Sequence, residues 1–235
     1  MISVVIPAYN EEEHIAYCLQ SLVNQKTDTL FEVIVVDNAS SDHTAEVAEK
    51  FKKSLRLQVL SETYKSRGAA RAKGFAKAKG DIILSTDADA IVPPDWIERF
   101  VLELSKSDAA VTGFITWTDG PWWINTIAIV LQPVAVCVHR LWIGHNWLIG
   151  SNFAIWADIY RKSGGFTREL EGLEDIDLST KVVRLGRIRV VRNPKITASA
   201  RRFTGGLRKA AWEYIKATIE YTVLRKSRIA LSDVR

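Results

Sequence analysis

The 235-residue sequence contains little cysteine and no leader-like segment, and both absences narrow the classes of protein it fits. Its two cysteines, Cys18 and Cys137, are far apart in the sequence, which argues against a disulfide framework or a zinc site. Residues 2–6 are mostly apolar, but no basic segment precedes them, and Pro7 ends the run too early for a signal peptide. We therefore expect a reducing compartment and predict a cytoplasmic protein.

The sequence also lacks an uninterrupted apolar stretch long enough for a transmembrane helix. Its longest apolar stretch, residues 124–138, is interrupted by Asn125, Gln132 and Pro133, and tryptophans flank it. Such a stretch can form a buried helix or a helix that lies in a membrane interface. The flanking tryptophans favour the interface, although tryptophans also occur in protein cores.

Basic residues are in excess, with 32 Lys and Arg against 27 Asp and Glu, which gives a formal net charge of +5. The excess is concentrated late in the chain, around a predicted helix at about 207–224. It favours an anionic partner, such as nucleotide phosphates, nucleic acid or an acidic membrane surface, and a solvated basic face is the plain alternative. We expect one domain over 1–235, made of a first half (1–96), a second half (97–200) and a basic C-terminal helix (201–235).

Apolar runs alternate with amphipathic segments in the first half. Strands are predicted at 2–6, 33–36, 55–60 and 82–84. Helices are predicted after an Asn10 cap with Glu11–Glu13 in the first turn, after a Ser41 or Asp42 cap to about Phe51, and at 69–78, closed by Gly80. This order predicts an α/β fold with a mostly parallel, Rossmann-like sheet and helices on both faces. Further on, the sequence predicts helices at 94–104 and 176–185 and a strand at 109–116.

Polar residues follow three of the predicted strands. Pro7–Glu11 follows the first, Asp37 ends the second, and Asp87-Ala88-Asp89 follows the fourth. Because parallel strands bring their carboxyl ends to one edge of the sheet, and ligands bind outside that edge, we expect the three clusters to share one crevice. Two carboxylates one residue apart suit Mg²⁺ or Mn²⁺ that also holds a phosphate.

Four motifs in this order resemble glycosyltransferase family 2, an inverting group with the GT-A fold. They are Val4–Glu11, Val33–Asp42, Gly68–Gly74 and Gly80–Asp89. The resemblance covers residues 2–96 and implies a UDP- or GDP-sugar donor with Mg²⁺ or Mn²⁺. It implies that the nucleotide is bound by Pro7, Ala8, Tyr9, Glu11, Asp37, Arg71 and Asp87, and that Asp89 and Asp87 hold the metal. Two positions depart from the family pattern: Asn38 stands where many members have Asp, and Lys73 where they often have Asn.

The second half resembles the family more loosely. The resemblance implies that residues 1–96 are the nucleotide-sugar-binding half and that residues 97–200 are the acceptor and catalytic half. The pair Glu174-Asp175 is similar to the family's Glu-Asp motif, which implies that Asp175 is the catalytic base and that Glu174 positions the acceptor. We expect Asp177 to cap the helix or pair locally. Ser151 and Asn152 lie in a segment that resembles an acceptor loop. Arg201 and Arg202 are expected to meet the diphosphate, an anionic acceptor or a lipid headgroup.

Other functions are weaker readings of the sequence. The Gln-x-x-Arg-Trp motif of processive polysaccharide synthases is absent, which argues for transfer of a single sugar. We expect the acceptor to be a glycan or a lipid-linked molecule. The protein could be peripheral on the cytoplasmic face of the membrane. A nucleotidyltransferase would normally carry a basic, glycine-rich loop after the first strand, and a dinucleotide oxidoreductase would carry G-x-G-x-x-G there. A non-catalytic binder of membrane surface or nucleic acid stays open because of the basic C-terminal segment, but we expect no nucleic acid partner.

Overall fold

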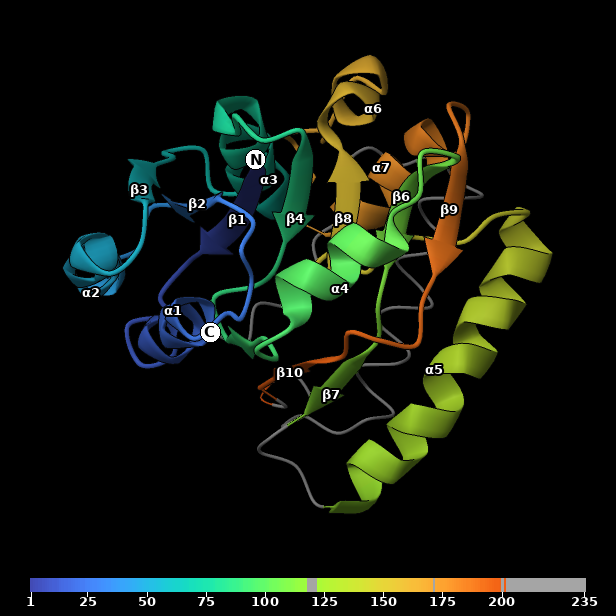
Figure 1. Cartoon of the computed structure of the whole chain (residues 1–235), viewed down its shortest axis with the longest axis horizontal. Helices are drawn as coiled ribbons and strands as arrows, with labels where there is room; N and C mark the ends of the chain where they lie inside the picture. Colours follow the sequence, from blue (N-terminus) through green and yellow to red (C-terminus); the bar gives the residue numbers. More distant parts are fainter. Residues whose placement is uncertain (118–121, 171, 200, 202–235) are drawn as a thin grey trace.

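The computed structural model describes residues 1–117, 122–170, 172–199 and 201 (Figure 1). In chain order the elements are β1 (Ile2–Ala8), α1 (Ile15–Val23), β2 (Phe31–Asp37), α2 (Thr44–Glu49), the 3-10 helix η1 (Lys50–Lys53), β3 (Leu57–Ser61), α3 (Arg67–Lys77), β4 (Ile82–Ser85), β5 (Ala90–Ile91), α4 (Trp96–Glu103), β6 (Asp108–Thr112), β7 (Ile115–Trp117), α5 (Trp122–Ile143), β8 (Phe153–Trp156), α6 (Ala157–Lys162), α7 (Glu174–Val182), β9 (Arg187–Val190) and β10 (Ile196–Ala198). The predicted 207–224 helix and Arg202 lie outside the described residues.

A seven-stranded sheet forms the centre of the molecule, in the order β3-β2-β1-β4-β8-β6-β9. Strands β1 to β4 are parallel, as predicted, so their carboxyl ends share one edge. Strand β8 runs antiparallel to both β4 and β6, while β6 and β9 are parallel. The predicted α/β class with a mostly parallel sheet is therefore confirmed.

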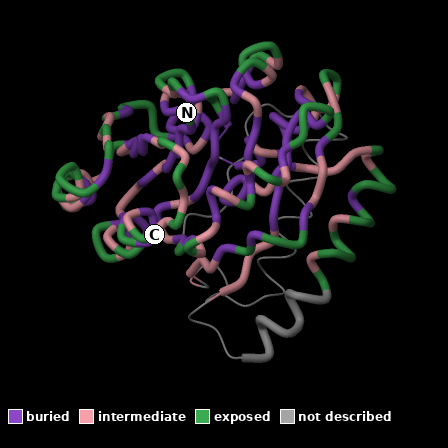
Figure 2. The backbone as a smooth tube through the Cα atoms, viewed as in Figure 1, coloured by how far each residue is buried: buried purple, intermediate pink, exposed green. Residues whose placement is uncertain are grey.

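Strand β1 explains why helices cover both faces of this sheet. Its residues are buried on both sides because successive side chains of a strand point to opposite faces. Val4 and Ile6 belong to a core cluster that includes residues of α1, α2 and α4. Val5 belongs to a second cluster with Phe75 of α3 and residues of α6 and α7. Figure 2 shows the central strands as the most continuously buried part of the chain.

The strand predicted at 109–116 is wrong in one respect, because it is divided between two sheets. Strand β6 belongs to the central sheet, and β7 joins a three-stranded sheet in the order β5-β10-β7. The break falls at Gly113, where an added Cβ would lie 2.3 Å from the carbonyl oxygen of Pro194. Close backbone approach at this point requires glycine and turns the chain from one sheet to the other.

Two predicted helix boundaries are also wrong. Helix α1 begins at Ile15, so Asn10 does not cap it, and its first turn contains no acidic residue. Asn10 instead adopts a left-handed conformation with φ of 52°, which asparagine tolerates, and its Oδ1 accepts a hydrogen bond from the backbone of Ser41 at 2.9 Å. Gly80 does not close α3 with a positive φ; an added Cβ there would lie 2.6 Å from the nitrogen of Ser3.

Helix α5 lies beside the main body and contains the apolar stretch noted in the sequence (Figure 1). Its described side chains, from residue 131 onward, are mostly exposed, as Figure 2 shows, so the alternative of a buried helix is wrong for this part. Within the described ranges, no helix combines the length and apolarity needed to cross a bilayer.

Candidate active site

A small cleft opens at the carboxyl ends of the parallel strands. Its lining comes from the ends of β1, β2 and β4 and from the start of α3. The lining residues are Pro7, Ala8, Tyr9, Asn38, Arg67, Ala70, Arg71 and Asp87. The structure thus brings together Pro7, Ala8, Tyr9, Arg71 and Asp87, which the sequence assigns to one nucleotide pocket.

Two buried polar atoms beside the cleft have no hydrogen-bond partner among the described residues. One is Oδ1 of Asp37, at the end of β2, and the other is Nε of Arg71. Because buried polar atoms in folded proteins are nearly always paired, such atoms indicate where a ligand's polar groups could bind. The neighbouring Asn38 is different: its Nδ2 donates to the carbonyl oxygens of Glu62 and Tyr64, at 3.2 and 2.8 Å. That role explains how an amide is accommodated at this position.

Tyr9 lines the cleft and is contacted by a residue that the sequence analysis missed. The Nζ atom of Lys65 lies 4.0 Å from the centroid of the Tyr9 ring and donates a hydrogen bond to its hydroxyl. The other missed residue, Arg67, follows at the start of α3. The signal for both was the basic run Lys65-Ser66-Arg67 directly before the third motif, where Ser66 caps α3 by accepting from Ala69.

Arg71 connects the donor edge of the sheet to helix α7. Its buried guanidinium donates through Nη2 to Oδ1 of Asp87, at 2.6 Å, and through Nη1 to Oε1 of Glu174. Burial disfavours a charged guanidinium, but the carboxylates of Asp87 and Glu174 outweigh it and raise the pKa of Arg71 above its ordinary value. A single buried cation therefore ties the fourth motif to the Glu-Asp pair.

Asp175 stands next to this cluster at the start of α7. Its Oδ2 accepts from the backbone N–H of Gly150 at 3.1 Å, and its Oδ1 accepts from that of Ile176 at 2.8 Å. Burial of the carboxyl group, reinforced by the charge of Glu174, raises the pKa of Asp175 to about 6, although Arg71 opposes the rise. A Cβ on Gly150 would lie 3.2 Å from both Asp175 Oδ2 and Arg71 Nη2. A larger residue at this loop position would therefore crowd both side chains.

Glu11 and Asp89 meet through a residue from the far end of the described chain. Nη2 of Arg201 lies 2.5 Å from both carboxylate oxygens of Glu11 and 2.9 Å from Oδ2 of Asp89. Burial works against the charge of Arg201, but the two carboxylates raise its pKa above the ordinary value. Sequence analysis assigned Glu11 to the nucleotide and Arg201 to phosphate or acceptor, and it missed that the two residues form an ion pair.

The acceptor-loop residues Ser151 and Asn152 are both buried. Oδ1 of Asn152 accepts from Nε1 of Trp96 at 2.9 Å, and its Nδ2 donates to the carbonyls of Phe114 and Pro194 at 2.9 and 3.0 Å. This geometry fits a residue that holds the loop in place better than one that contacts a ligand. Asp177 pairs locally, as predicted, with Lys181 at 2.8 Å.

The sheet and its cleft define an open α/β protein with a nucleotide-type site at the carboxyl ends of parallel strands. Comparison with protein families refines that class. The model of the family described as glycosyl transferase family 2 matches residues 3–164. The chain belongs to that family, which confirms the resemblance of its motifs.

Individual relatives agree with this assignment. The Bacillus subtilis protein named "Probable glycosyltransferase YdaM" is 30% identical over 201 residues, which cover 79% of this chain and 47% of that protein. The first four curated relatives are matched over only 29% to 47% of their own lengths. The chain therefore spans less than half of each of them.

Solved structures agree at the level of the fold. The structure of Staphylococcus aureus TarS 1-349 in complex with UDP-GlcNAc is similar with a TM-score of 0.66 and 22% identity, over 84% of this chain and 58% of that one. The mannosyltransferase PcManGT from Pyrobaculum calidifontis, in complex with GDP-Man and Mn²⁺, gives a TM-score of 0.69 and 22% identity, over 97% and 65%. The predicted GT-A fold is confirmed by these similarities.

Proposed function

We propose that this protein is an inverting glycosyltransferase that moves one sugar from a nucleoside-diphosphate sugar to an acceptor hydroxyl. The observation that carries the proposal is the position of Arg71 between Asp87 and Glu174, with Asp175 alongside. Because of this cluster, the donor edge of the sheet and a carboxylate able to take a proton form one connected site. Family membership and the two sugar-nucleotide complexes of similar fold support the same function.

The donor nucleotide would occupy the cleft at the ends of β1 and β2. The unpartnered Oδ1 of Asp37 is suited to accept a hydrogen bond from a base or ribose group, and the Tyr9 ring offers a flat surface to the base. Pro7 and Ala8 present backbone at the strand end. Among similar structures the donor is UDP-GlcNAc in one and GDP-Man in another, which supports a UDP- or GDP-sugar for this chain.

The carboxylates of Asp87 and Asp89 fit a hard divalent cation. Their donor atoms are all oxygens, and Mg²⁺ or Mn²⁺ typically takes one or two carboxylates and fills its remaining positions with phosphate oxygens and water. The guanidinium of Arg201 at 2.9 Å from Asp89 supports this reading, because the carboxylate is already arranged to face a positive charge. Among the described residues no group of three or more His, Cys, Asp and Glu could hold a metal, so the phosphates would complete the site. When bound, the ion would neutralise charge on the departing nucleoside diphosphate.

Asp175 would act as the base. As the acceptor oxygen attacks the anomeric carbon, the bond from that carbon to the diphosphate breaks and its electron pair leaves with the nucleoside diphosphate. The acceptor's proton passes to a carboxylate oxygen of Asp175, and attack opposite the leaving group inverts the anomeric centre. A pKa of about 6 suits this step for two reasons. Most molecules carry the ionised carboxylate at pH 7, and that carboxylate is a stronger base than an ordinary aspartate. Glu174 would fix Arg71 and, through it, the geometry of the site.

The acceptor is a glycan or lipid-linked hydroxyl in this proposal. The exposed apolar side chains of α5 support a membrane-proximal acceptor and a peripheral association with the cytoplasmic face of the membrane. Residues 1–96 would serve as the donor half and residues 97–200 as the acceptor half of one domain.

The direct test is to incubate the protein with UDP- and GDP-sugars, with and without Mn²⁺, and to identify the released nucleotide. We expect release of a nucleoside diphosphate that depends on Mn²⁺ or Mg²⁺ and is lost in an Asp89→Ala/Asp175→Ala double variant. Release of pyrophosphate instead would identify a nucleotidyltransferase. Full activity of the double variant would contradict the proposal.

A further inference from the structure

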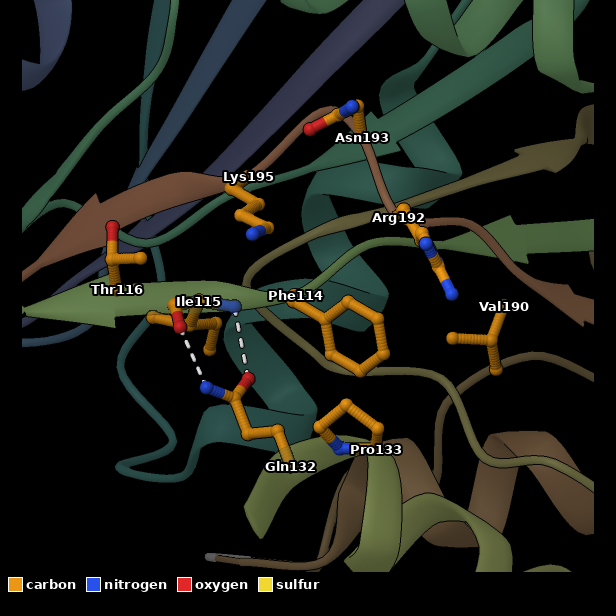
Figure 3. Close-up of a pocket in the computed structure, with 9 residues that line it drawn as sticks. All are labelled: Phe114, Ile115, Thr116, Gln132, Pro133, Val190, Arg192, Asn193 and Lys195. Carbon is orange, nitrogen blue, oxygen red and sulfur yellow. Dashed lines mark hydrogen bonds between the residues drawn. The ribbon is translucent and has the colours of Figure 1, made fainter. Parts of the chain in front are cut away.

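A second and larger cavity lies away from the cleft, where α5 meets the small sheet (Figure 3). It has a volume of about 540 Å³, within the range of small-molecule sites. It is lined by Phe114, Ile115, Thr116, Gln132, Pro133, Val190, Arg192, Asn193 and Lys195. None of these residues lines the nucleotide cleft.

The walls of this cavity are mostly apolar. Phe114, Pro133 and Val190 lie close to one another in Figure 3 and present hydrocarbon surface. The amide of Gln132 adds little polar surface to the cavity, because it forms hydrogen bonds with the backbone of a neighbouring strand. Its Nε2 donates to the carbonyl oxygen of Ile115 at 2.7 Å, and its Oε1 accepts from the backbone nitrogen of Ile115 at 3.0 Å. The pair fixes α5 against β7 and leaves an apolar surface.

The rim of the cavity is positively charged. The side chains of Arg192 and Lys195 point toward the side of the cavity where Phe114 lies, whereas Asn193 points away (Figure 3). Both cations are exposed, and neither forms an ion pair with a described residue. Among the described residues no acidic side chain lines the cavity, and the sequence has no Asp or Glu between Asp119 and Asp158. The two cations of this rim therefore attract an anionic group.

An exposed apolar stripe also runs along α5, on the side of the helix that faces away from the cavity. Its members recur at helical spacing on one face, starting with Leu131 and Val134, which flank the two residues of α5 that line the cavity. The stripe consists of Leu131, Val134, Val138, Leu141 and Trp142, whose exposed fractions range from 51% to 82%. An apolar surface of this kind on the solvent-exposed side of a helix is typical of a site that contacts a partner or a membrane.

We propose that this cavity binds an anionic amphiphile, namely a phospholipid of an anionic bilayer. The phosphate head would lie between Arg192 and Lys195, and the hydrocarbon chain would pack on the apolar wall formed by Phe114, Pro133 and Val190. Charge complementarity at the rim, together with the apolar wall beneath it, favours a lipid over a protein partner. The inference goes beyond glycosyl transfer, because no described residue lines both the cavity and the cleft.

The primary test is co-sedimentation with vesicles of phosphatidylcholine containing phosphatidylglycerol. We expect binding that is lost with pure phosphatidylcholine and weakened at least about tenfold by Arg192→Glu/Lys195→Glu, since two charges are reversed at the surface. A matched control is Lys53→Glu/Lys77→Glu, which makes the same charge change at exposed sites remote in the fold from α5. The control should bind within about twofold of the unchanged protein.

A soluble probe separates the cavity from general surface charge. Decyl phosphate, used below its micellar concentration, should bind by calorimetry, and inorganic phosphate and decyl maltoside should not compete with it. Val134→Ser/Val138→Ser, on the side of α5 that faces away from the cavity, should leave binding of decyl phosphate unchanged. The proposal is overturned if the Arg192→Glu/Lys195→Glu protein binds anionic vesicles as well as the unchanged protein does, if the control loses binding equally, or if inorganic phosphate displaces the probe. Nucleotide binding by the same variants reports on the cleft, so failure here is distinguishable from failure of glycosyl transfer.

Discussion

The acidic limb of the pH profile tests the role assigned to Asp175. If its pKa is about 6, the carboxylate is about 9% ionised at pH 5 and about 91% at pH 7, so turnover should rise about tenfold across this range. An unperturbed aspartate, with its ordinary value of 3.8, would already be about 94% ionised at pH 5, and turnover would be nearly flat. The size of the rise therefore distinguishes a base in this enclosed site from an ordinary surface carboxylate.

Glu174→Gln adds a directional test of the same reasoning. The charge of Glu174 raises the pKa of Asp175, so its removal should shift the acidic limb to lower pH, toward the ordinary value. The assay is release of nucleoside diphosphate at saturating donor and Mn²⁺ between pH 4.5 and pH 8. Asp177→Asn is the matched control, because that residue is bound to Lys181 and should leave the limb in place. A limb that moves to higher pH in Glu174→Gln, or a flat profile in the unchanged protein, would refute the reasoning.

Three further predictions concern stability and charge. Because the folded pKa of Asp175, about 6, lies above 3.8, the folded protein should lose on the order of 3 kcal/mol of stability as the pH rises from about 4 to about 6, and Asp175→Asn should abolish this loss in denaturant titrations. Arg201→Ala should strengthen binding of Mn²⁺ alone several-fold in electron paramagnetic resonance titrations, because the guanidinium no longer neutralises Glu11 and Asp89. Asn152→Ala should lower the free energy of unfolding by about 3 kcal/mol, because it leaves the buried indole N–H of Trp96 and the carbonyl of Pro194 without the Asn152 partner.

Each of these predictions has a clear contrary result. Equal pH dependence of stability in the Asp175→Asn and unchanged proteins would mean that this carboxyl ionises normally. Weaker Mn²⁺ binding in Arg201→Ala would mean that Arg201 helps to build the metal site rather than competing for it. A loss below about 1 kcal/mol in Asn152→Ala, with activity abolished, would favour the original reading of Asn152 as a residue that contacts the acceptor or phosphate.

The donor edge could be predicted because its signals are local in the sequence. Strands β1, β2 and β4 are short apolar runs that end in polar residues, and parallel pairing alone brings those ends together. Asp37 and Asp87 were therefore identified from their positions after buried strands. The resemblance to a family added Arg71, and the structure places it against Asp87.

The rest of the site depends on contacts that no local pattern encodes. Arg201 lies 190 residues from Glu11 and 112 from Asp89 in sequence, so its ion pairs follow only from the folded path of the chain. Asn152 resembles a ligand-binding residue in sequence because it is polar and lies two residues after Gly150. Its burial depends on Phe114 and Pro194, which belong to segments that meet only after the two sheets form.

Short elements were missed for a related reason. Strand β8 has four residues, Phe153–Trp156, and passes directly into α6, so it shows neither a strand-length alternation nor a turn signal. Helix α5 left two readings open because an apolar stretch looks the same whether it faces a core or a membrane. The path of the chain decides between these readings for residues 131–143, by leaving one face of the helix uncovered.

The most direct measurement of the central claim compares donor binding and turnover in Asp175→Asn. We expect this variant to bind a UDP- or GDP-sugar with Mn²⁺ as tightly as the unchanged protein in calorimetry, because Asp175 touches neither Asp37 nor Asp89. Its release of nucleoside diphosphate should fall by at least about a hundredfold, since it lacks the base. Turnover near that of the unchanged protein would contradict the assignment of Asp175 as the group that takes the acceptor's proton.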